Sequence, residues 1–439
     1  MPGQYISIEE AVQKIELANL IFQKNKSGFQ HRPKDKIRKV GQILIHKKEE
    51  FAKVITSEMG KPVFEAIAEI EKSALNCDFY ADNSDEFLKD RNYETGRYSA
   101  IVRYEPLGVI LGVMPWNFPF WQVFRFAVPT ILAGNTVVVK HASNVPKSAQ
   151  LIEEIFLEAG FEKGVYQNLS LESKHIETII EHPFIKAVSL TGSEKAGSSV
   201  ASAAGKVIKK SVLELGGSNA FIVMDDADLE LILDKAINAR YRNAGQSCIA
   251  AKRFLVQEGI YDSFLEKFTS KVKALKMGDP FDESTEIGPL ARVDLAEDLE
   301  KQVNQSVEMG AKIITGGKRY EAYYEPTVLT ETTTEMPVFT EETFGPVAVI
   351  KKFKTFEEAV ELSNLTTFGL GVSICTNNIT NYKDKVHLFE EGAVFFNELV
   401  RSDPKLPFGG VKKSGFGREL SEEGIKEFVN TKTVFFAKI

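Results

Sequence analysis

The chain of 439 residues is 43% hydrophobic and 26% charged, a balance typical of a folded protein rather than a disordered one. Because a single hydrophobic core usually stops growing at roughly 250–300 residues, two or more domains are expected. The 54 Lys and Arg residues are outnumbered by 61 acidic residues and form no basic block, which argues against nucleic acid as a partner. Three cysteines in so long a chain exclude a disulfide scaffold.

The sequence predicts neither a signal peptide nor a membrane span. Residues Met1–Lys14 contain no apolar core of a signal peptide. The apolar region Leu107–Val139 is longer than the roughly 20 residues that a membrane span needs. Pro115, Pro119 and Pro129 interrupt it, so it is predicted to be strand, loop, helix, turn and strand in a buried α/β core. We therefore expect a cytoplasmic protein without a membrane partner.

Two patterns predict helices in the N-terminal region. Ser7, followed three residues later by Glu10, forms a capping box, and apolar residues follow it at helical spacing. A second helix face is predicted from apolar residues in alternating steps of four and three, namely Val63, Ile67, Ile70, Ala74 and Cys77. Cys77 is expected to pack in the core as a small hydrophobe.

From Leu107 onward, short apolar runs alternate with helical segments, as in parallel strands joined by crossover helices. A second such series is expected to begin near Gly217. The segments Arg97–Tyr104 and Thr431–Lys438 are rich in Tyr, Val and Phe and are predicted to pair as strands outside either core. The other predicted strands are Val109–Val113, Thr136–Val139, Ala187–Leu190, Ser211–Leu215, Phe221–Val223, Lys252–Val256, Val347–Phe353, Val372–Cys375 and Ala393–Asn397. The predicted crossover helices include Lys147–Ala159 and Leu229–Tyr241.

Glu214 is the most unusual residue of the predicted strands. It stands inside an apolar run, where a carboxylate is costly to bury unless it has a task or a partner. Gly216 and Gly217 then predict a turn at the end of the strand, which is the edge where ligands bind in open α/β sheets. A buried carboxylate with a raised pKa acts as a general base near neutral pH.

Two loops supply further candidate groups. Cys248 follows Gly245 in a loop of small residues, where a backbone approaches a ligand closely, although a lone Cys in such a loop is more often structural than catalytic. Asn117 lies between Pro115 and Pro119, which stiffen its loop. Its amide could donate to a developing oxyanion beside the backbone N–H of Cys248, or satisfy the backbone groups of a turn.

Together these groups resemble the aldehyde dehydrogenase superfamily. The resemblance covers nearly the whole chain, from roughly Phe29 to Phe436, and the order of the groups is that of the family. Glu214 precedes Cys248 by 34 residues (248 − 214), and Asn117 precedes it by 131 (248 − 117). The segments that carry the resemblance are Pro115–Pro119, Val212–Gly217, Asn243–Cys248 and Glu341–Pro346.

The resemblance implies a role for each catalytic candidate. Cys248 is expected to attack an aldehyde as a thiolate, with Asn117 and the Cys248 N–H stabilising the oxyanion. Hydride transfer to a nicotinamide then leaves a thioester, and Glu214 activates the water that hydrolyses it. The presence of Glu214 favours this route over that of CoA-acylating relatives, in which the corresponding acid is typically absent.

The cofactor site has no Gly-x-Gly-x-x-Gly fingerprint. Gly192 and Ser193 instead join a predicted strand to a helix whose N–H groups could hold a pyrophosphate, although an ordinary strand–helix turn looks similar. The resemblance implies that Glu342 holds the nicotinamide ribose and that Phe344 packs beside the nicotinamide. It implies a dinucleotide site lined by Trp116, Lys140, Gly192, Ser193, Leu215, Glu342 and Phe344.

Ser143 bears on the choice between the two nicotinamide cofactors. NAD-restricted members often have a carboxylate at this position, which would repel the 2′-phosphate of NADP. Ser143 removes that repulsion, and Lys140 could attract the phosphate, so we expect NADP⁺ to be accepted alongside NAD⁺. His141 and the pair Glu194-Lys195 depart from the commoner family pattern and bear on cofactor affinity.

Two arginines predict a carboxylated substrate. Arg125 lies in a largely apolar stretch, and Arg242 precedes Cys248 by six residues. Each alone would more often be structural. Both, however, match positions at which succinate-semialdehyde dehydrogenases hold the substrate carboxylate, and a guanidinium group suits a bidentate hold. Ser402 is a further candidate donor to that carboxylate.

The leading expectation is therefore the oxidation of succinate semialdehyde to succinate with NADP or NAD. The alternatives are another short aldehyde, such as glutarate semialdehyde or a neutral aliphatic aldehyde, and a non-catalytic protein that keeps the fold. The six histidines show no paired ligand spacing, so no metal site is expected.

The expected architecture is α/β and aldehyde-dehydrogenase-like, in three parts. Residues 1–90 and 106–216 form a doubly wound dinucleotide-binding domain, and residues 217–410 form an α/β catalytic domain. Residues 91–105 and 411–439 form a small β element that bridges subunits. Its exposed strand edges predict a homodimer or homotetramer.

Overall fold

A computed structural model describes residues 5–437; residues 1–4 and 438–439, including the predicted strand end at Lys438, lie outside the described part. The helices are α1 (Ile8–Asn25), α2 (Lys34–His46), α3 (Lys48–Met59), α4 (Val63–Phe87), α5 (Trp121–Leu132), α6 (Pro146–Glu158), α7 (Ile176–Glu181), α8 (Glu194–Lys206), α9 (Leu229–Tyr241), α10 (Tyr261–Ala274), α11 (Val293–Glu308), α12 (Pro337–Thr340), α13 (Phe356–Asn364) and α14 (Ser421–Lys426). The main strands are β1 (Arg91–Glu94), β2 (Tyr98–Pro106), β3 (Val109–Met114), β4 (Thr136–His141), β5 (Tyr166–Asn168), β6 (Ile185–Thr191), β7 (Lys210–Glu214), β8 (Asn219–Val223), β9 (Ala251–Gln257), β10 (Lys312–Thr315), β13 (Thr327–Thr330), β14 (Val347–Phe353), β16 (Val372–Cys375), β17 (Val394–Phe396), β19 (Gly415–Phe416) and β20 (Val429–Ala437).

The first sheet contains six strands in the order β19-β7-β6-β3-β4-β5. All neighbouring strands run parallel except the edge pair of β19 and β7. Strands β4 and β5, which come next in the chain, lie on one side of β3, whereas β6 and β7 lie on the other side. The strand order therefore reverses between β3 and β6, and open α/β sheets bind ligands at the carboxyl ends of the strands at such a reversal.

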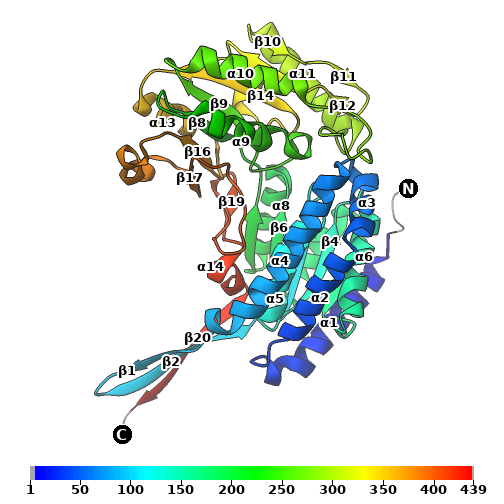
Figure 1. Cartoon of the computed structure of the whole chain (residues 1–439). Helices are drawn as coiled ribbons and strands as arrows, with labels where there is room; N and C mark the ends of the chain where they lie inside the picture. Colours follow the sequence, from blue (N-terminus) through cyan, green and yellow to red (C-terminus); the bar gives the residue numbers. More distant parts are fainter. Residues whose placement is uncertain (1–4, 438–439) are drawn as a thin grey trace.

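Helices cover both faces of this sheet (Figure 1). One face packs against a cluster that includes side chains of α2, α3, α4, α5 and α6, and the other packs against side chains of α1, α7 and α8. Every residue of β4 is buried, as expected of a parallel strand that is covered on both sides. The carboxyl ends of the strands are thus held by a rigid two-sided core.

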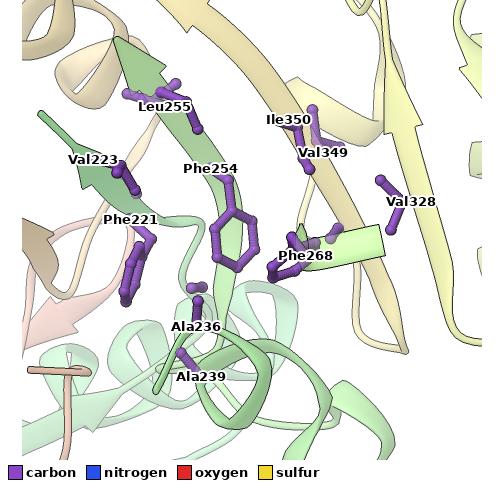
Figure 2. Close-up of a cluster of buried hydrophobic side chains, with 14 of the residues drawn as sticks. Phe221, Val223, Ala236, Ala239, Phe254, Leu255, Phe268, Val328, Val349 and Ile350 are labelled. Atoms are coloured by element: carbon purple, nitrogen blue, oxygen red, sulfur yellow. The ribbon is translucent and has the colours of Figure 1, made fainter. Parts of the chain in front are cut away.

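The second sheet contains seven strands in the order β10-β13-β14-β9-β8-β16-β17, and only β10 runs antiparallel to its neighbour. Its core is rich in aromatic rings. The ring of Phe254 on β9 lies 4.9 Å from that of Phe268 on α10 and 5.4 Å from that of Phe221 on β8, centroid to centroid. Figure 2 shows these rings facing Ala236 and Ala239 of α9, whose small side chains let the helix approach the sheet.

A third sheet, in the order β1-β2-β20, projects from the body as an arm (Figure 1). Strands β2 and β20 pair over nine positions, from Tyr98 opposite Ala437 to Pro106 opposite Val429, which confirms the predicted pairing of these segments. The C-terminal segment also contributes to the main body, because β19 pairs with β7 and α14 packs against α4 and α5. The predicted domain boundaries themselves stay predictions.

Most sequence predictions of local structure are confirmed. Each predicted strand of the two large sheets overlaps an observed one, and the helix Leu229–Tyr241 has the predicted bounds. The capping box of Ser7 and Glu10 is present at the start of α1. Cys77 and Cys375 are both buried in the hydrophobic cores. Between residues 5 and 437, no helix is both long and apolar enough to cross a membrane.

We predict that Arg253→Met lowers the free energy of unfolding by about 3 kcal/mol, because it leaves buried carbonyls without donors. The buried Arg253 guanidinium donates to the carbonyls of Ser218, Leu362 and Ser363 at 2.6–2.9 Å, which ties β9 to the segment before β8 and to α13. Urea unfolding monitored by fluorescence measures the change. The control is Arg319→Met, which removes a surface ion pair with Glu300 at 2.8 Å and should cost less than about 1 kcal/mol. Equal losses in the two variants would contradict the prediction.

Candidate active site

The sequence-predicted catalytic residues meet where the two large sheets face each other. Glu214 is the last residue of β7, and the chain then crosses through Gly216 and Gly217 to β8 of the second sheet. Asn117 follows β3 in the first sheet, and Cys248 lies in the loop that precedes β9 in the second. The carboxyl ends of the strands in the first sheet therefore face the amino ends of the strands in the second sheet, and the candidate site lies between them.

The loop before Cys248 is held in an unusual backbone conformation. Asn243, Ala244 and Gly245 all have positive φ, at 54°, 50° and 75°. Such a conformation costs of order 1–3 kcal/mol at a non-glycine residue, so neighbouring contacts must stabilise it. The Asn243 N–H donates to Glu65 Oε2 at 2.7 Å, and a Cβ on Gly245 would lie 2.4 Å from a backbone oxygen of Gly345. The surrounding structure thus fixes the loop and, with it, the sulfur.

Hydrogen bonds tie the Asn117 loop to the cysteine loop. Asn117 Nδ2 donates to the Gln246 carbonyl at 3.0 Å, and Asn243 Nδ2 donates to the Asn117 carbonyl at 3.0 Å. Asn117 Oδ1 accepts from Gln122 Nε2 at 3.1 Å, which orients the amide. One hydrogen of Asn117 Nδ2 is left over, and the backbone N–H of Cys248 donates to no acceptor within residues 5–437. Two N–H donors are therefore available beside the sulfur.

The Cys248 thiol is half-buried, and burial raises its pKa to about 11. The positive charges of Arg125 and Lys252 oppose the rise, whereas the carboxylates of Glu342 and Glu214 add to it. The resting group is therefore a thiol rather than a thiolate near neutral pH.

Lys252 is a buried cation beside Cys248 that the sequence reasoning missed. Its Nζ donates to the carbonyls of Ser247 at 3.1 Å and Cys248 at 3.2 Å and forms an ion pair with Glu342 Oε1 at 2.9 Å. A further hydrogen bond reaches the carbonyl of Gly217. Lys252 thus joins the cysteine loop to the crossing between the sheets and to Glu342. The sequence did contain a signal for Lys252. Two adjacent cations, Lys252 and Arg253, interrupt the apolar segment Ala251–Val256, just as Glu214 interrupts its own apolar strand.

Glu214 is 2% exposed, and neither of its carboxylate oxygens has a hydrogen-bond partner among the described residues. Burial, followed by the neighbouring Glu419, raises the pKa of Glu214 well above its ordinary value, and the charges of Arg125 and Arg418 only partly oppose this. A Cβ on Gly409 would lie 2.7 Å from Glu214 Oε1, so that glycine leaves room beside the carboxylate. The group is a strong base with free lone pairs and adjacent space.

A cleft between the sheets contains most of the predicted cofactor residues. Its lining includes Trp116, Gly192, Ser193, Leu215, Glu342 and Phe344, together with Asn117 and Cys248. The rings of Trp116 and Phe344 lie 5.9 Å apart, edge to face. Ser193 caps the N-terminus of the 13-residue helix α8 by accepting the Ala196 N–H at 3.3 Å. The remaining N–H groups of that first turn are free to face an anion.

Two predicted cofactor residues lie outside this lining, at the carboxyl end of β4. Lys140 Nζ donates to Ser173 Oγ at 3.0 Å, and burial lowers its pKa. Ser143 is exposed in the loop that follows. Since β4 neighbours β3, both residues lie on the same sheet edge as Trp116, one strand further along.

A second cavity reaches Cys248 and contains the predicted substrate residues. Arg125, Arg242 and Ser402 line it, together with Lys72 and Phe408. Among the described residues, only Cys248 and Gln122 line both this cavity and the cofactor cleft. The sulfur therefore lies at the junction of two separate spaces.

The two arginines differ in their partners. Arg125 forms a buried ion pair with Glu419, lies 3.3 Å from Thr191 Oγ1 and stacks 4.7 Å from the Phe408 ring centroid. Arg242 forms no ion pair within 4 Å among residues 5–437. Arg125 is thus paired directly with a carboxylate, whereas Arg242 is not, although its charge acts on the nearby buried carboxyl of Glu65.

The comparison with known proteins decides the family. The sequence profile described as the aldehyde dehydrogenase family matches residues 5–434. The chain belongs to the aldehyde dehydrogenase family. It is therefore an oxidoreductase of the family that the motifs around Cys248, Glu214 and Asn117 predicted.

This aldehyde dehydrogenase is similar to several named relatives. It is 48% identical to a probable succinate-semialdehyde dehydrogenase (NADP⁺) of Synechocystis sp., over 98% of this chain and 95% of the relative. It is 48% identical to the succinate semialdehyde dehydrogenase Sad, named as NAD(P)⁺-dependent, of Escherichia coli K12, over 92% and 88%. Among solved structures, a succinic semialdehyde dehydrogenase of Streptococcus pyogenes in complex with NADP⁺ superposes with a TM-score of 0.97, at 37% identity, over 100% of this chain and 97% of the other.

The largest set of site residues that sequence reasoning missed lies on α4 of the dehydrogenase. Glu65, Glu69 and Lys72 follow one another at helical spacing and point into the protein between the apolar residues of the predicted stripe. Glu69 Oε1 accepts the N–H groups of Phe120 at 2.9 Å and Trp121 at 3.1 Å. The spacing of these charges next to the apolar stripe was visible in the sequence, but their partners lie far along the chain.

We predict that alkylation of Cys248 by iodoacetamide accelerates about tenfold per pH unit from pH 7 to 10, because only the thiolate reacts and its pKa is about 11. Lys252→Met removes a nearby positive charge and should slow the reaction at each pH. Mass spectrometry of labelled peptides measures the rate. Cys248→Ser, which cannot be labelled at this position, gives the background, and buried Cys77 is an internal control. A rate that stays constant below pH 9 would contradict a thiol pKa raised by burial.

Proposed function

We propose that this aldehyde dehydrogenase oxidises succinate semialdehyde to succinate, with NADP⁺ or NAD⁺ as the hydride acceptor. The observation that carries the proposal is that two cations without a carboxylate of residues 5–437 within 4 Å, Arg242 and Lys72, line the cavity that ends at Cys248. Arg242 has no ion-pair partner there, whereas the apolar walls, which include Phe408 and Trp121, suit a short carbon chain. A carboxylate at the far end of such a chain would neutralise that charge. The names of the relatives from Synechocystis sp. and E. coli support the same substrate.

The residues around the sulfur suit oxidation through a thioester. The Cys248 thiol first loses its proton to water. The thiolate Sγ then forms a bond to the aldehyde carbon, and the carbonyl oxygen becomes an oxyanion that accepts from Asn117 Nδ2 and the Cys248 N–H. Bound NAD(P)⁺ supplies the hydride acceptor. Loss of the hydride re-forms the carbonyl as a thioester on Cys248. Glu214 then takes a proton from the water that attacks this thioester, and the thiolate leaves as the carboxylate forms.

The cofactor fits the cleft that the other predicted residues line. The first turn of α8 would hold the pyrophosphate, and Trp116 with Phe344 would flank the nicotinamide end beside Cys248. Glu342 lies 3.0 Å from the Gly217 N–H and would accept from the nicotinamide ribose in the same position. On the sheet edge at β4, Lys140 and exposed Ser143 would meet the adenosine ribose and accept a 2′-phosphate. The Streptococcus pyogenes neighbour is described as a complex with NADP⁺.

We further propose that the protein is a cytoplasmic homodimer or homotetramer that assembles through its three-stranded arm. Strand β20 is a nine-residue edge, and Phe435 and Phe436 on it are 58% and 49% exposed. Long exposed edges with apolar side chains are favourable sites for pairing with another chain. Strand β20 of the arm has both a long exposed edge and exposed apolar side chains.

The substrate proposal is tested by a kcat/KM panel. Succinate semialdehyde, glutarate semialdehyde and butanal should be compared for the wild type, Arg242→Gln and Arg125→Gln, with Cys248→Ala as the inactive reference. Arg242→Gln should lower kcat/KM for succinate semialdehyde about 10- to 100-fold and spare butanal, because it removes a charge that only the carboxylate uses. Arg125→Gln should affect both aldehydes, since it also leaves Glu419 unpaired beside Glu214. A wild type that prefers butanal would refute the substrate.

The cofactor proposal is tested by adding charge at Ser143. Ser143→Glu should raise the KM for NADP⁺ about 10-fold or more while changing that for NAD⁺ by less than about twofold, because a carboxylate repels only the 2′-phosphate. Ser143→Ala is the matched control and should retain both cofactors. Steady-state kinetics with each cofactor measures the effect, and an equal change for both would place the 2′-phosphate elsewhere.

A further inference from the structure

We propose that Lys72 is a substrate-binding residue that, together with the hydroxyl of Ser402, holds the substrate carboxylate and selects carboxylated over neutral aldehydes. The inference rests on the proposed substrate class and adds the residue that recognises it. Lys72 lies in the middle of α4, at the wall of the cavity that Arg242 and Cys248 also line.

The Lys72 ammonium contacts no carboxylate of the described residues. The nearest acid on its own helix, Glu69, is already engaged: it forms a buried ion pair with Lys61 and accepts the backbone N–H groups of Phe120 and Trp121. Within residues 5–437, Lys72 has no carboxylate within 4 Å. Its ammonium instead lies 4.2 Å from the ring centroid of Trp121, a favourable site for a cation but one without negative charge.

The contacts of Ser402 point to a missing hydrogen-bond acceptor. Ser402 Oγ accepts from Lys72 Nζ at 2.7 Å and from Trp121 Nε1 at 3.1 Å. The Trp121 indole N–H only donates, and so does Lys72 in its ammonium form, so in that form the two lone pairs of the hydroxyl are occupied and its hydrogen is free for an acceptor. No described residue accepts it. Since Ser402 is 6% exposed and lines the cavity, a carboxylate oxygen of the substrate is the acceptor that completes the site.

The position of the Lys72 ammonium also differs from that expected of a lysine with a purely structural role. A structural lysine would use its carbon stem for packing and bring its ammonium to solvent or to an acid. Lys72 brings it to a buried hydroxyl on the cavity wall, beside a second unpaired cation, Arg242. Two cations without a directly contacting carboxylate among the described residues and a polarised O–H group thus line the same cavity, and together they suit the two oxygens of a carboxylate.

The charge of Lys72 changes near neutral pH. Burial lowers its pKa to about 7, with Arg242 of the cysteine loop and Arg125 of α5 adding to the effect and Asp403 and Glu69 opposing it. A bound carboxylate favours the ammonium form. Below pH 7 Lys72 is charged and holds the carboxylate; as the pH rises above 7, the free enzyme loses this charge and the preference for a carboxylated aldehyde falls, at most tenfold per pH unit.

Another group near this cavity titrates in the same range. Glu65, on the opposite side of Arg242, has a pKa raised to about 7 by burial, and its ionisation also disfavours an anion. The substitution of Lys72 by arginine separates the two, because a guanidinium remains charged throughout this range while Glu65 is unchanged.

The test compares the ratio of kcat/KM for succinate semialdehyde to that for butanal from pH 6 to 9. Effects of pH on Cys248 and Glu214 cancel in this ratio, because both aldehydes use the same chemistry. Lys72→Met keeps the stem and should lower the ratio about 10- to 100-fold at pH 6. Its ratio should also lose most of its pH dependence. Lys72→Arg should keep a high ratio that falls less with pH than that of the wild type.

The matched control is Lys405→Met, an exposed lysine in the same loop as Ser402 that does not line the cavity, which should behave as the wild type. A Lys72→Met enzyme that loses activity on both aldehydes equally, or keeps the wild-type ratio, would overturn the proposal. Failure of the substrate proposal is distinct from this outcome, because the wild type itself would then show no preference for succinate semialdehyde over butanal.

Discussion

One turn of α4 sets the geometry of the active site. The buried carboxylate of Glu69 accepts two backbone N–H groups at the start of α5, just after the loop of Asn117, and Glu65 accepts the N–H of Asn243 in the loop of Cys248. Two buried carboxyl groups on one helix thus hold loops that come from different sheets. The cost of burying them is offset by Lys61 and by the backbone donors, and the strained backbone before Cys248 persists because these bonds hold it.

The low polarity around the reacting groups weakens the nucleophile Cys248 and strengthens the base Glu214. Burial raises the pKa of the Cys248 thiol to about 11, which suppresses the nucleophile, and raises that of Glu214, which strengthens the base. Lys252 and Arg125 lie where they favour the thiolate. The charge that forms on the substrate oxygen during the reaction would therefore be stabilised by the fixed N–H groups of Asn117 and Cys248 rather than by water.

The sequence predicted the parts of this protein that depend on local pattern. Strands β3, β4, β6 to β9, β14, β16 and β17 follow from short apolar runs, whereas the short strands β5, β10 and β13 were not predicted. The catalytic candidates follow from a resemblance carried by neighbouring residues. The partners of Arg125, Lys72 and Lys252 could not be predicted, because each lies on an element distant in the chain: Glu419 follows Arg125 by nearly 300 residues, and Ser402 follows Lys72 by 330. Periodicity identifies which face of α4 is buried, but not which loop packs against it.

Because Cys248 and Gln122 are shared by two otherwise separate cavities, aldehyde and dinucleotide approach the sulfur from different directions. In the proposed function each of these molecules has a space of its own beside Cys248. The acid product can therefore depart while the reduced nucleotide is still in place, and a hydrolytic water can follow the product's route inward.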